Sequence, residues 1–146
     1  MKAVIQRVKN ASVEINKELF SKINSGILVL LGIEKSDTEE QARFLANKIV
    51  DLRIFADDTG KMNLSLLDIK GEILVVSQFT LAGDCSKGKR PGFDNAAKPD
   101  TAIPLYEKFL EYLEERGLTP KTGKFGAMMD IALVNDGPVT FILSAK

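Results

Sequence analysis

Short apolar segments separated by turn residues make up most of this chain, and they predict a fold built mainly from β-strands. The longest apolar run starts at Ile27 and is typical of a buried central strand. The first two strands should be joined by a short turn at Lys9-Asn10, and the last two by a hairpin turn at residues 135–138. In all, we expect strands at residues 3–8, 11–15, 27–33, 72–78, 128–134 and 139–143.

Two other segments carry apolar residues at helical spacing. The first begins at Ser36-Asp37-Thr38-Glu39, which matches a capping box, so the hydroxyl and the Glu39 carboxylate should pair with free backbone amides. A first helix is therefore predicted over about residues 37–51. Its buried stripe should consist of Ala42, Leu45, Ile49 and Leu52.

The second helical segment follows Asp100 and Thr101, either of which can cap a helix, and it tolerates Pro104 in its first turn. Gly117 suits its C-terminal end. Because runs of strands are interrupted by helices without strict alternation, the pattern predicts an α+β fold with a mostly antiparallel sheet and two main helices. The stripe expected to be buried on the second helix is Ile103, Tyr106, Phe109, Leu110 and Leu113.

The chain has 146 residues, of which 45% are apolar, and no linker or internal repeat divides it. We therefore expect residues 1–146 to form one domain that buries a core without metal or disulfide support. No apolar run is long enough to cross a membrane, and no signal peptide is evident at the start. These features predict a soluble, cytoplasmic protein without a membrane partner.

Charge limits the kinds of partner that the chain can have. Twenty basic and twenty acidic residues give a formal net charge of zero. A protein that coats nucleic acid through its phosphates usually has a strong basic excess, so any contact with nucleic acid should be local. The one notable basic cluster contains Lys87, Lys89 and Arg90, and such a cluster is by itself most often part of a solvated loop.

The residue types present exclude several kinds of catalytic site. The chain has no histidine and a single cysteine, Cys85. This composition excludes Ser-His-Asp and Cys-His catalysis, His-ligated metals and Cys-rich zinc sites. A catalyst built from this chain must use carboxylates, hydroxyls, amides, backbone groups or its own substrate, and we expect neither a metal nor another cofactor.

A first polar motif, Ser77-Gln78-Phe79-Thr80-Leu81, follows directly from the strand predicted at residues 72–78. Functional polar groups commonly gather where a strand runs into a glycine-containing loop, and Gly83 follows here. The alternative is a strand that becomes amphipathic where it reaches the surface.

A second motif, Asn135-Asp136-Gly137-Pro138-Val139-Thr140, resembles a hairpin turn with one unusual feature. Asp-Gly favours a tight turn, yet Pro138 has no N–H at the point where a paired strand would resume. A cis bond between Gly137 and Pro138 would direct two successive carbonyls to the same side, as a rigid acceptor without side chains. A simple turn is the alternative.

Together these motifs resemble the D-aminoacyl-tRNA deacylase family, also known as D-tyrosyl-tRNA deacylases. The resemblance covers essentially the whole chain and differs at Gly92, where many members carry serine. Such a difference concerns local loop contacts rather than the central site. The segments that carry the resemblance are SQFTL and NDGPVTF, together with AVIQRV, RIFADDTGKMN, KGKRPGF and TGKFGA.

This resemblance implies a homodimer of barrel-like subunits whose active sites lie at the subunit interface. The segment Ser77–Thr80 would line the pocket of one subunit, and Gly137-Pro138 would reach into that pocket from the other. Arg7 is similar to the arginine that helps to hold the Gly-Pro carbonyls. The residues at positions near the adenosine end of the tRNA are Ala102, Phe125 and Met129.

The implied activity is hydrolysis of the ester bond of D-aminoacyl-tRNA, as chiral proofreading in translation. Thr80 has no adjacent base, so we assign it a hydrogen-bonding role. Nearby backbone amides would stabilise the charge on the carbonyl oxygen. Water would attack with help from the ribose 2′-hydroxyl. The Gly-Pro carbonyls would accept the ammonium of a D-residue and obstruct the Cβ of an L-residue. Glycyl-tRNA, including tRNA-Ala mischarged with glycine, should therefore also react. The basic cluster would then contact tRNA phosphates.

Three other functions stay open at this stage. The chain could be a non-catalytic module that binds RNA ends or nucleotides in the same pocket. It could be a hydrolase of small esters or amides that depends on threonine or a carboxylate, or a structural dimer protein.

Overall fold

Strand β1 (Lys2–Ile15) lies at the centre of a six-stranded sheet in the computed structural model, which describes residues 1–146. Its first half pairs antiparallel with β3 (Gly26–Gly32) and its second half with β2 (Glu18–Ile23). Strand β8 (Asp130–Ser144) pairs with β1 over nearly its whole length, also antiparallel. Most of the sheet is therefore built around one strand.

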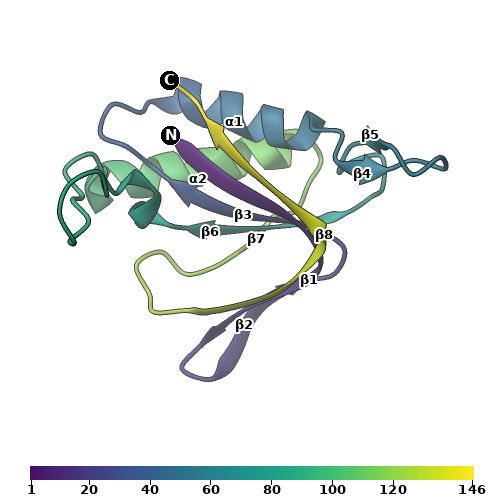
Figure 1. Cartoon of the computed structure of the whole chain (residues 1–146), viewed down its shortest axis with the longest axis horizontal. Helices are drawn as coiled ribbons and strands as arrows, with labels where there is room; N and C mark the ends of the chain where they lie inside the picture. Colours follow the sequence, from purple (N-terminus) through teal and green to yellow (C-terminus); the bar gives the residue numbers. More distant parts are fainter.

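Two parallel pairs extend the sheet beyond β3, through β6 (Glu72–Ser77) and β7 (Lys121–Thr122). The sheet is strongly curled (Figure 1), and the Ser21 hydroxyl of β2 donates a 2.6 Å hydrogen bond to the Thr122 carbonyl of β7. This contact nearly closes the sheet into a barrel. The predicted α+β fold with a mostly antiparallel, barrel-like sheet and two main helices is confirmed.

The two helices, α1 (Glu39–Asp51) and α2 (Pro99–Glu115), lie on the same face of the sheet (Figure 1). They cover a main core of 24 buried residues, while a second cluster of seven buried residues lies on the opposite face. A small separate sheet pairs β4 (Phe55–Ala56) with β5 (Met62–Leu64). Neither helix is long and apolar enough to cross a membrane.

Helix α1 starts later than the sequence predicts. Its N-cap is Thr38 rather than Ser36, and Gln41 completes the capping box. The physical reason is a contact with a distant part of the chain. Asp37 turns into the core, where its carboxylate binds the amino group of Met1, so the helix can begin only after it.

Helix α2 starts earlier than predicted, at Pro99, and its N-cap residue Lys98 makes no side-chain hydrogen bond. Neither Asp100 nor Thr101 is the cap, because a proline in the first helical position needs no partner for its nitrogen. Gly117 follows the helix with a φ of 86°, which agrees with the predicted C-terminal end.

The buried stripe of α2 is only partly as predicted. Ile103 is exposed and Leu110 is half-buried, because both lie on the flanks of the face that packs against the sheet and α1. The side chains on that face are Ala102, Leu105, Tyr106, Phe109, Tyr112 and Leu113.

Strand β1 is one element, not two strands joined at Lys9-Asn10. The turn comes later, at Asn16 and Lys17, which have φ values of 53° and 65°. Strand β2 after this turn was not predicted, because Leu19 and Phe20 are both exposed and give no alternation of apolar and polar residues.

Strand β8 is also one element where two were predicted. Residues 128–134 and 139–143 do not pair with each other, since both halves of β8 pair with β1. Between them, Asp136–Val139 lie opposite the single residue Arg7 and bulge out of the ladder. Pro138 has no N–H with which to continue the ladder, so the chain leaves it and rejoins it further on.

Asn135 holds this bulge through its side-chain amide. The amide oxygen accepts a 2.7 Å hydrogen bond from the N–H of Val139. The amide nitrogen donates to the Val139 carbonyl at 3.2 Å and to the Thr140 hydroxyl at 3.0 Å. Both backbone groups of the buried Val139 are thus paired with one side chain.

Gly137 and Arg7 hold the rest of the bulge. Gly137 has a φ of 151°, and a Cβ there would lie 2.6 Å from Cγ2 of Val139, so a side chain does not fit. Arg7 donates from Nε to the Asp136 carbonyl at 2.9 Å and from a terminal nitrogen to the Ile54 carbonyl at 2.7 Å. The Gly137–Pro138 peptide bond is cis, as predicted.

Replacing Asn135 with alanine should loosen the bulge. The N–H and the carbonyl of Val139 would lose their partners, and an unsatisfied buried polar group costs about 1–3 kcal/mol. We expect Asn135→Ala to lower the free energy of unfolding by about that amount, measured by chemical denaturation. Asn135→Asp is the matched control, because it can still accept from Val139 N–H and should lose less. Equal stability of the alanine variant and the unchanged protein would contradict this role.

Candidate active site

A pocket of about 730 Å³ opens where β6 ends. Here the chain turns into a short 3₁₀ helix, η1 (Phe79–Ala82), and the start of α2 and the segment before β8 form further walls. The walls are mostly apolar. Seven of the residues predicted for the site line this one pocket: Ser77, Gln78, Phe79, Thr80, Ala102, Phe125 and Met129.

The turn at η1 sets the direction of the polar groups. The Gln78 N–H makes the last bond from β6 to β3, at 2.8 Å to the Leu31 carbonyl. The Gln78 side-chain amide then donates to the hydroxyl of Thr80. The backbone N–H groups of Phe79 and Thr80 have no acceptor within the chain, as is usual at the start of a helical turn. They are free to bind a substrate oxygen.

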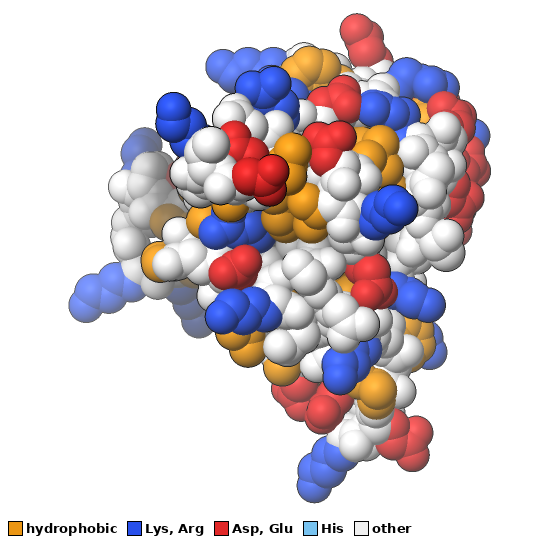
Figure 2. Space-filling view, turned by 90° about the vertical axis from the view of Figure 1, so that its right-hand side faces the viewer, with side chains coloured by type: hydrophobic (Ala, Val, Ile, Leu, Met, Phe, Trp, Pro, Cys, Tyr) orange, Lys and Arg blue, Asp and Glu red, His pale blue; other side chains and the backbone are white.

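No ionisable side chain lines the pocket. Elsewhere, Lys and Arg side chains are interspersed with Asp and Glu, as on the face that carries β4 and β5 (Figure 2). No group of three His, Cys, Asp or Glu side chains is placed to hold a metal ion. The pocket therefore offers hydroxyl, amide and backbone groups, but no side chain that could act as a general base.

Tyr106 supports the pocket from the side of α2. Its hydroxyl donates a 2.8 Å hydrogen bond to the Val75 carbonyl, which also accepts from Gly123 N–H at 3.2 Å. Its ring meets Phe125 edge-on, with 5.9 Å between the ring centroids. Burial raises the pKa of the Tyr106 hydroxyl, so it stays protonated and remains a donor. Phe125 is thus fixed against a rigid neighbour.

Gly137 and Pro138 do not line the pocket of their own chain. Both are exposed on the bulge of β8. Arg7, predicted to help hold the Gly-Pro carbonyls, lies beside this segment but binds the Asp136 carbonyl rather than those of Gly137 or Pro138. The bulge therefore lies on the surface of the molecule, outside the pocket of its own chain.

The predicted basic cluster lies at the tip of an exposed loop. Two backbone hydrogen bonds between Asp84 and Gly92, of 2.8 and 2.9 Å, close the base of this loop. Lys87, Lys89 and Arg90 are exposed on its tip, and none of them forms an ion pair. Their contact with phosphate stays a prediction.

Sequence reasoning gave no role to two residues near these elements, although both lie in segments that it singled out. One is Asn135, whose role depends on the bulge. The other is Phe93, whose ring meets Phe79 edge-on at 5.1 Å between centroids. A large aromatic residue in an otherwise polar loop is the signal that could have drawn attention to Phe93.

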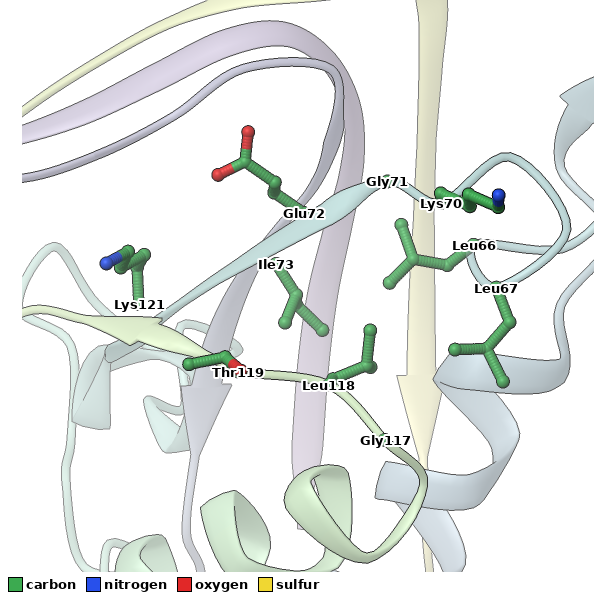
Figure 3. Close-up of a pocket in the computed structure, with 10 residues that line it drawn as sticks. All are labelled: Leu66, Leu67, Lys70, Gly71, Glu72, Ile73, Gly117, Leu118, Thr119 and Lys121. Carbon is green, nitrogen blue, oxygen red and sulfur yellow. The ribbon is translucent and has the colours of Figure 1, made fainter.

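A second cavity, of about 410 Å³, lies at the opposite end of β6 (Figure 3). Ile73 and Leu118 lie in its middle, whereas the side chains of Lys70 and Lys121 point away from each other at its two sides (Figure 3). Its polar groups do not converge, and none of the predicted site residues lines it. The pocket at η1 is therefore the candidate active site.

Known proteins related to this chain match it over nearly its whole length. A model of the family described as D-Tyr-tRNA(Tyr) deacylase matches residues 4–144. The D-aminoacyl-tRNA deacylase of Geotalea uraniireducens is 62% identical over 143 residues, covering 98% of this chain and 92% of that protein. The protein of the same name from Thermus aquaticus is 58% identical over 146 residues, covering 100% and 96%.

Solved structures agree with this relationship. One titled "c-Myc DNA Unwinding Element Binding Protein" has a TM-score of 0.94 at 45% identity and covers 100% of this chain and 99% of that one. A "probable eukaryotic D-amino acid tRNA deacylase" has a TM-score of 0.83 and covers 97% of both chains, but its 18% identity supports only the fold. The resemblance noted in the sequence is confirmed, as is the prediction of an enzyme. This chain belongs to the D-Tyr-tRNA(Tyr) deacylase family.

Proposed function

We propose that this protein hydrolyses the ester bond of D-aminoacyl-tRNA and releases free tRNA and the D-amino acid. Relatives named D-aminoacyl-tRNA deacylase support this activity. The observation that carries it is a single pocket that joins the Ser77–Thr80 segment to the apolar residues Ala102, Phe125 and Met129, without any ionisable side chain. Such a pocket suits a substrate that supplies part of the chemistry itself.

The apolar side of the pocket suits the terminal adenosine of tRNA. Phe125 and Met129 offer an aromatic ring and a thioether for the base, and the small side chain of Ala102 leaves room for it. With the base in this position, the ester would lie toward η1. There the free N–H groups of Phe79 and Thr80 can bind the carbonyl oxygen.

The hydrolysis needs no side chain as a base. Water, activated by the neighbouring ribose 2′-hydroxyl, would attack the carbonyl carbon of the ester. The bond between that carbon and the esterified ribose oxygen would then break, and this oxygen would leave with a proton from the attacking water. The charge that develops on the carbonyl oxygen would be stabilised by the N–H groups at Phe79 and Thr80. Because the Gln78 amide donates to the Thr80 hydroxyl, that hydroxyl is oriented to donate its own proton to the substrate.

Selection for D-residues requires a second copy of the chain. We propose a homodimer in which Gly137-Pro138 of one subunit completes the pocket of the other. The exposure of this segment supports the arrangement, as do Val134 and Ile142 on the same strand, which are 47% and 78% exposed. Its carbonyls would accept the ammonium of a D-residue, whereas the Cβ of an L-residue would collide with the backbone.

This steric selection would give the protein a role in chiral proofreading of charged tRNA in the cytoplasm. The loop with Lys87, Lys89 and Arg90 would contact phosphates near the acceptor end. One similar structure is titled as a protein that binds a DNA unwinding element. A net charge of zero and the mixed charges in Figure 2 do not favour broad contact with duplex DNA, so we do not extend that role to this chain.

The activity can be tested by incubating the protein with D-Tyr-tRNA and with L-Tyr-tRNA and measuring the tyrosine released. Tyrosine should be released from the D-substrate only, because the selection is steric. The ethyl ester of D-tyrosine is the control for a hydrolase of small esters, and it should react much more slowly than D-Tyr-tRNA. Equal release from both tRNAs, or a preference for the ethyl ester, would refute the proposal.

Glycyl-tRNA should be hydrolysed as well, including tRNA-Ala mischarged with glycine. Glycine has no Cβ to collide with the Gly-Pro backbone, so a steric filter cannot reject it. The measurement is release of glycine at rising protein concentration, with L-Ala-tRNA as the substrate that should stay intact. A protein that leaves glycyl-tRNA intact at high concentration must use some other means of selection.

Thr80→Ala tests whether Thr80 orients the substrate or attacks it. Loss of one hydrogen-bond donor should lower the single-turnover rate with D-Tyr-tRNA by about 10²–10³-fold at most. Thr80→Ser, which keeps the hydroxyl, should retain most of the rate. Complete loss of turnover in the alanine variant with unchanged tRNA binding would instead identify Thr80 as a nucleophile.

A further inference from the structure

Two exposed aromatic rings stand between the candidate pocket and the basic loop. Phe79 is 57% exposed and Phe93 is 39% exposed, and the rings meet edge-on at an angle of 62°. Phe79 also lines the pocket. Large apolar side chains that remain exposed next to a site often mark a contact surface.

Rigid backbone holds both rings in place. Phe79 opens η1, separated from β6 only by Gln78, and Phe93 follows Gly92, which is hydrogen-bonded to Asp84 through both of its backbone groups. Gly83 lies against Phe93 so closely that a Cβ there would come within 3.0 Å of its ring. The pair therefore forms a fixed surface.

Positive charge lies in the same loop as Phe93. Residues 83–98 contain four cationic and two anionic residues, and Lys87, Lys89 and Arg90 at the tip form no ion pair. At the other end of this segment, Ala97 lines the pocket. One loop therefore contains a residue that lines the pocket, one ring of the aromatic pair, and cationic side chains that form no ion pair.

We infer that Phe79 and Phe93 form a stacking surface for the unpaired nucleotide that precedes the terminal adenosine of tRNA. This inference rests on the proposed function, because the terminal adenosine must occupy the pocket. Aromatic rings beside cationic side chains are the usual means by which proteins hold single-stranded nucleic acid without reading its sequence. Because the rings meet edge-on, the base stacks on the face of one ring and meets the other at its edge, and its phosphate faces the basic loop.

The test compares two D-tyrosyl esters, D-Tyr-tRNA and D-tyrosyl-adenosine, which lacks the preceding nucleotide. The readout is the kcat/KM value for D-Tyr-tRNA divided by the kcat/KM value for D-tyrosyl-adenosine. Phe93→Leu should lower this ratio by about tenfold, the loss that removal of one stacking contact entails. Phe93→Tyr keeps the ring and should restore the ratio. Phe44→Leu, which removes a phenylalanine of α1 that is 54% exposed, is the control that should leave the ratio unchanged.

The outcomes separate this inference from other roles of Phe93. Equal losses on both esters would mean that Phe93 only supports Phe79, and no loss on either would mean that the pair does not bind substrate. Both results would overturn the inference. Release of no tyrosine from either ester by the unchanged protein would instead refute the proposed function itself.

Discussion

The interrupted ladder between β1 and β8 determines where the backbone groups of Gly137 and Pro138 lie. If the ladder were regular, Gly137 and Pro138 would be two ordinary strand residues. Because Asp136–Val139 bulge out opposite Arg7, the segment becomes an exposed backbone element in the middle of a long strand. The side-chain amide of Asn135 pairs with both backbone groups of Val139 in this bulge.

The same central strand also positions the pocket. Its first half pairs with β3, and β3 pairs in parallel with β6, so the end of β6 is fixed by two ladders before the chain turns at η1. The pocket has free backbone N–H groups at this turn, and the proposed shared site would add the carbonyls of the exposed bulge. Neither contribution depends on a titrating side chain. A backbone has less freedom than a side chain, and the proposed discrimination between mirror images would require such rigidity.

Much of the fold could be predicted from the sequence. Apolar spacing identified both helices, and the runs starting at Ile27 and Glu72 identified two central strands. The errors arose where a distant contact decides the outcome. Helix α1 starts late because Asp37 binds Met1, and β8 was divided in two because nothing local indicates that both of its halves pair with β1.

For the site too, local sequence patterns were informative, whereas contacts between distant residues could not be predicted from them. The motif at Ser77–Thr80 stood out at the end of a strand, but its association with Ala102, Phe125 and Met129 came only from the family resemblance. The structure brings these residues into one pocket. Asn135 and Phe93 were given no role because each makes a contact that exists only in the folded chain. The homodimer and the catalytic roles stay predictions.

The most direct test of the account mixes two variants, each expected to lose D-Tyr-tRNA hydrolysis, in the proposed dimer. Ala102→Phe should block the pocket, and Gly137→Ala should distort the bulge, because its Cβ would lie 2.6 Å from Val139. If each site takes its pocket from one subunit and its Gly-Pro segment from the other, a mixed dimer has one intact site. Co-refolding equal amounts should then restore about a quarter of the unmodified protein's D-Tyr-tRNA hydrolysis. A mixture no more active than its two components would contradict the shared site.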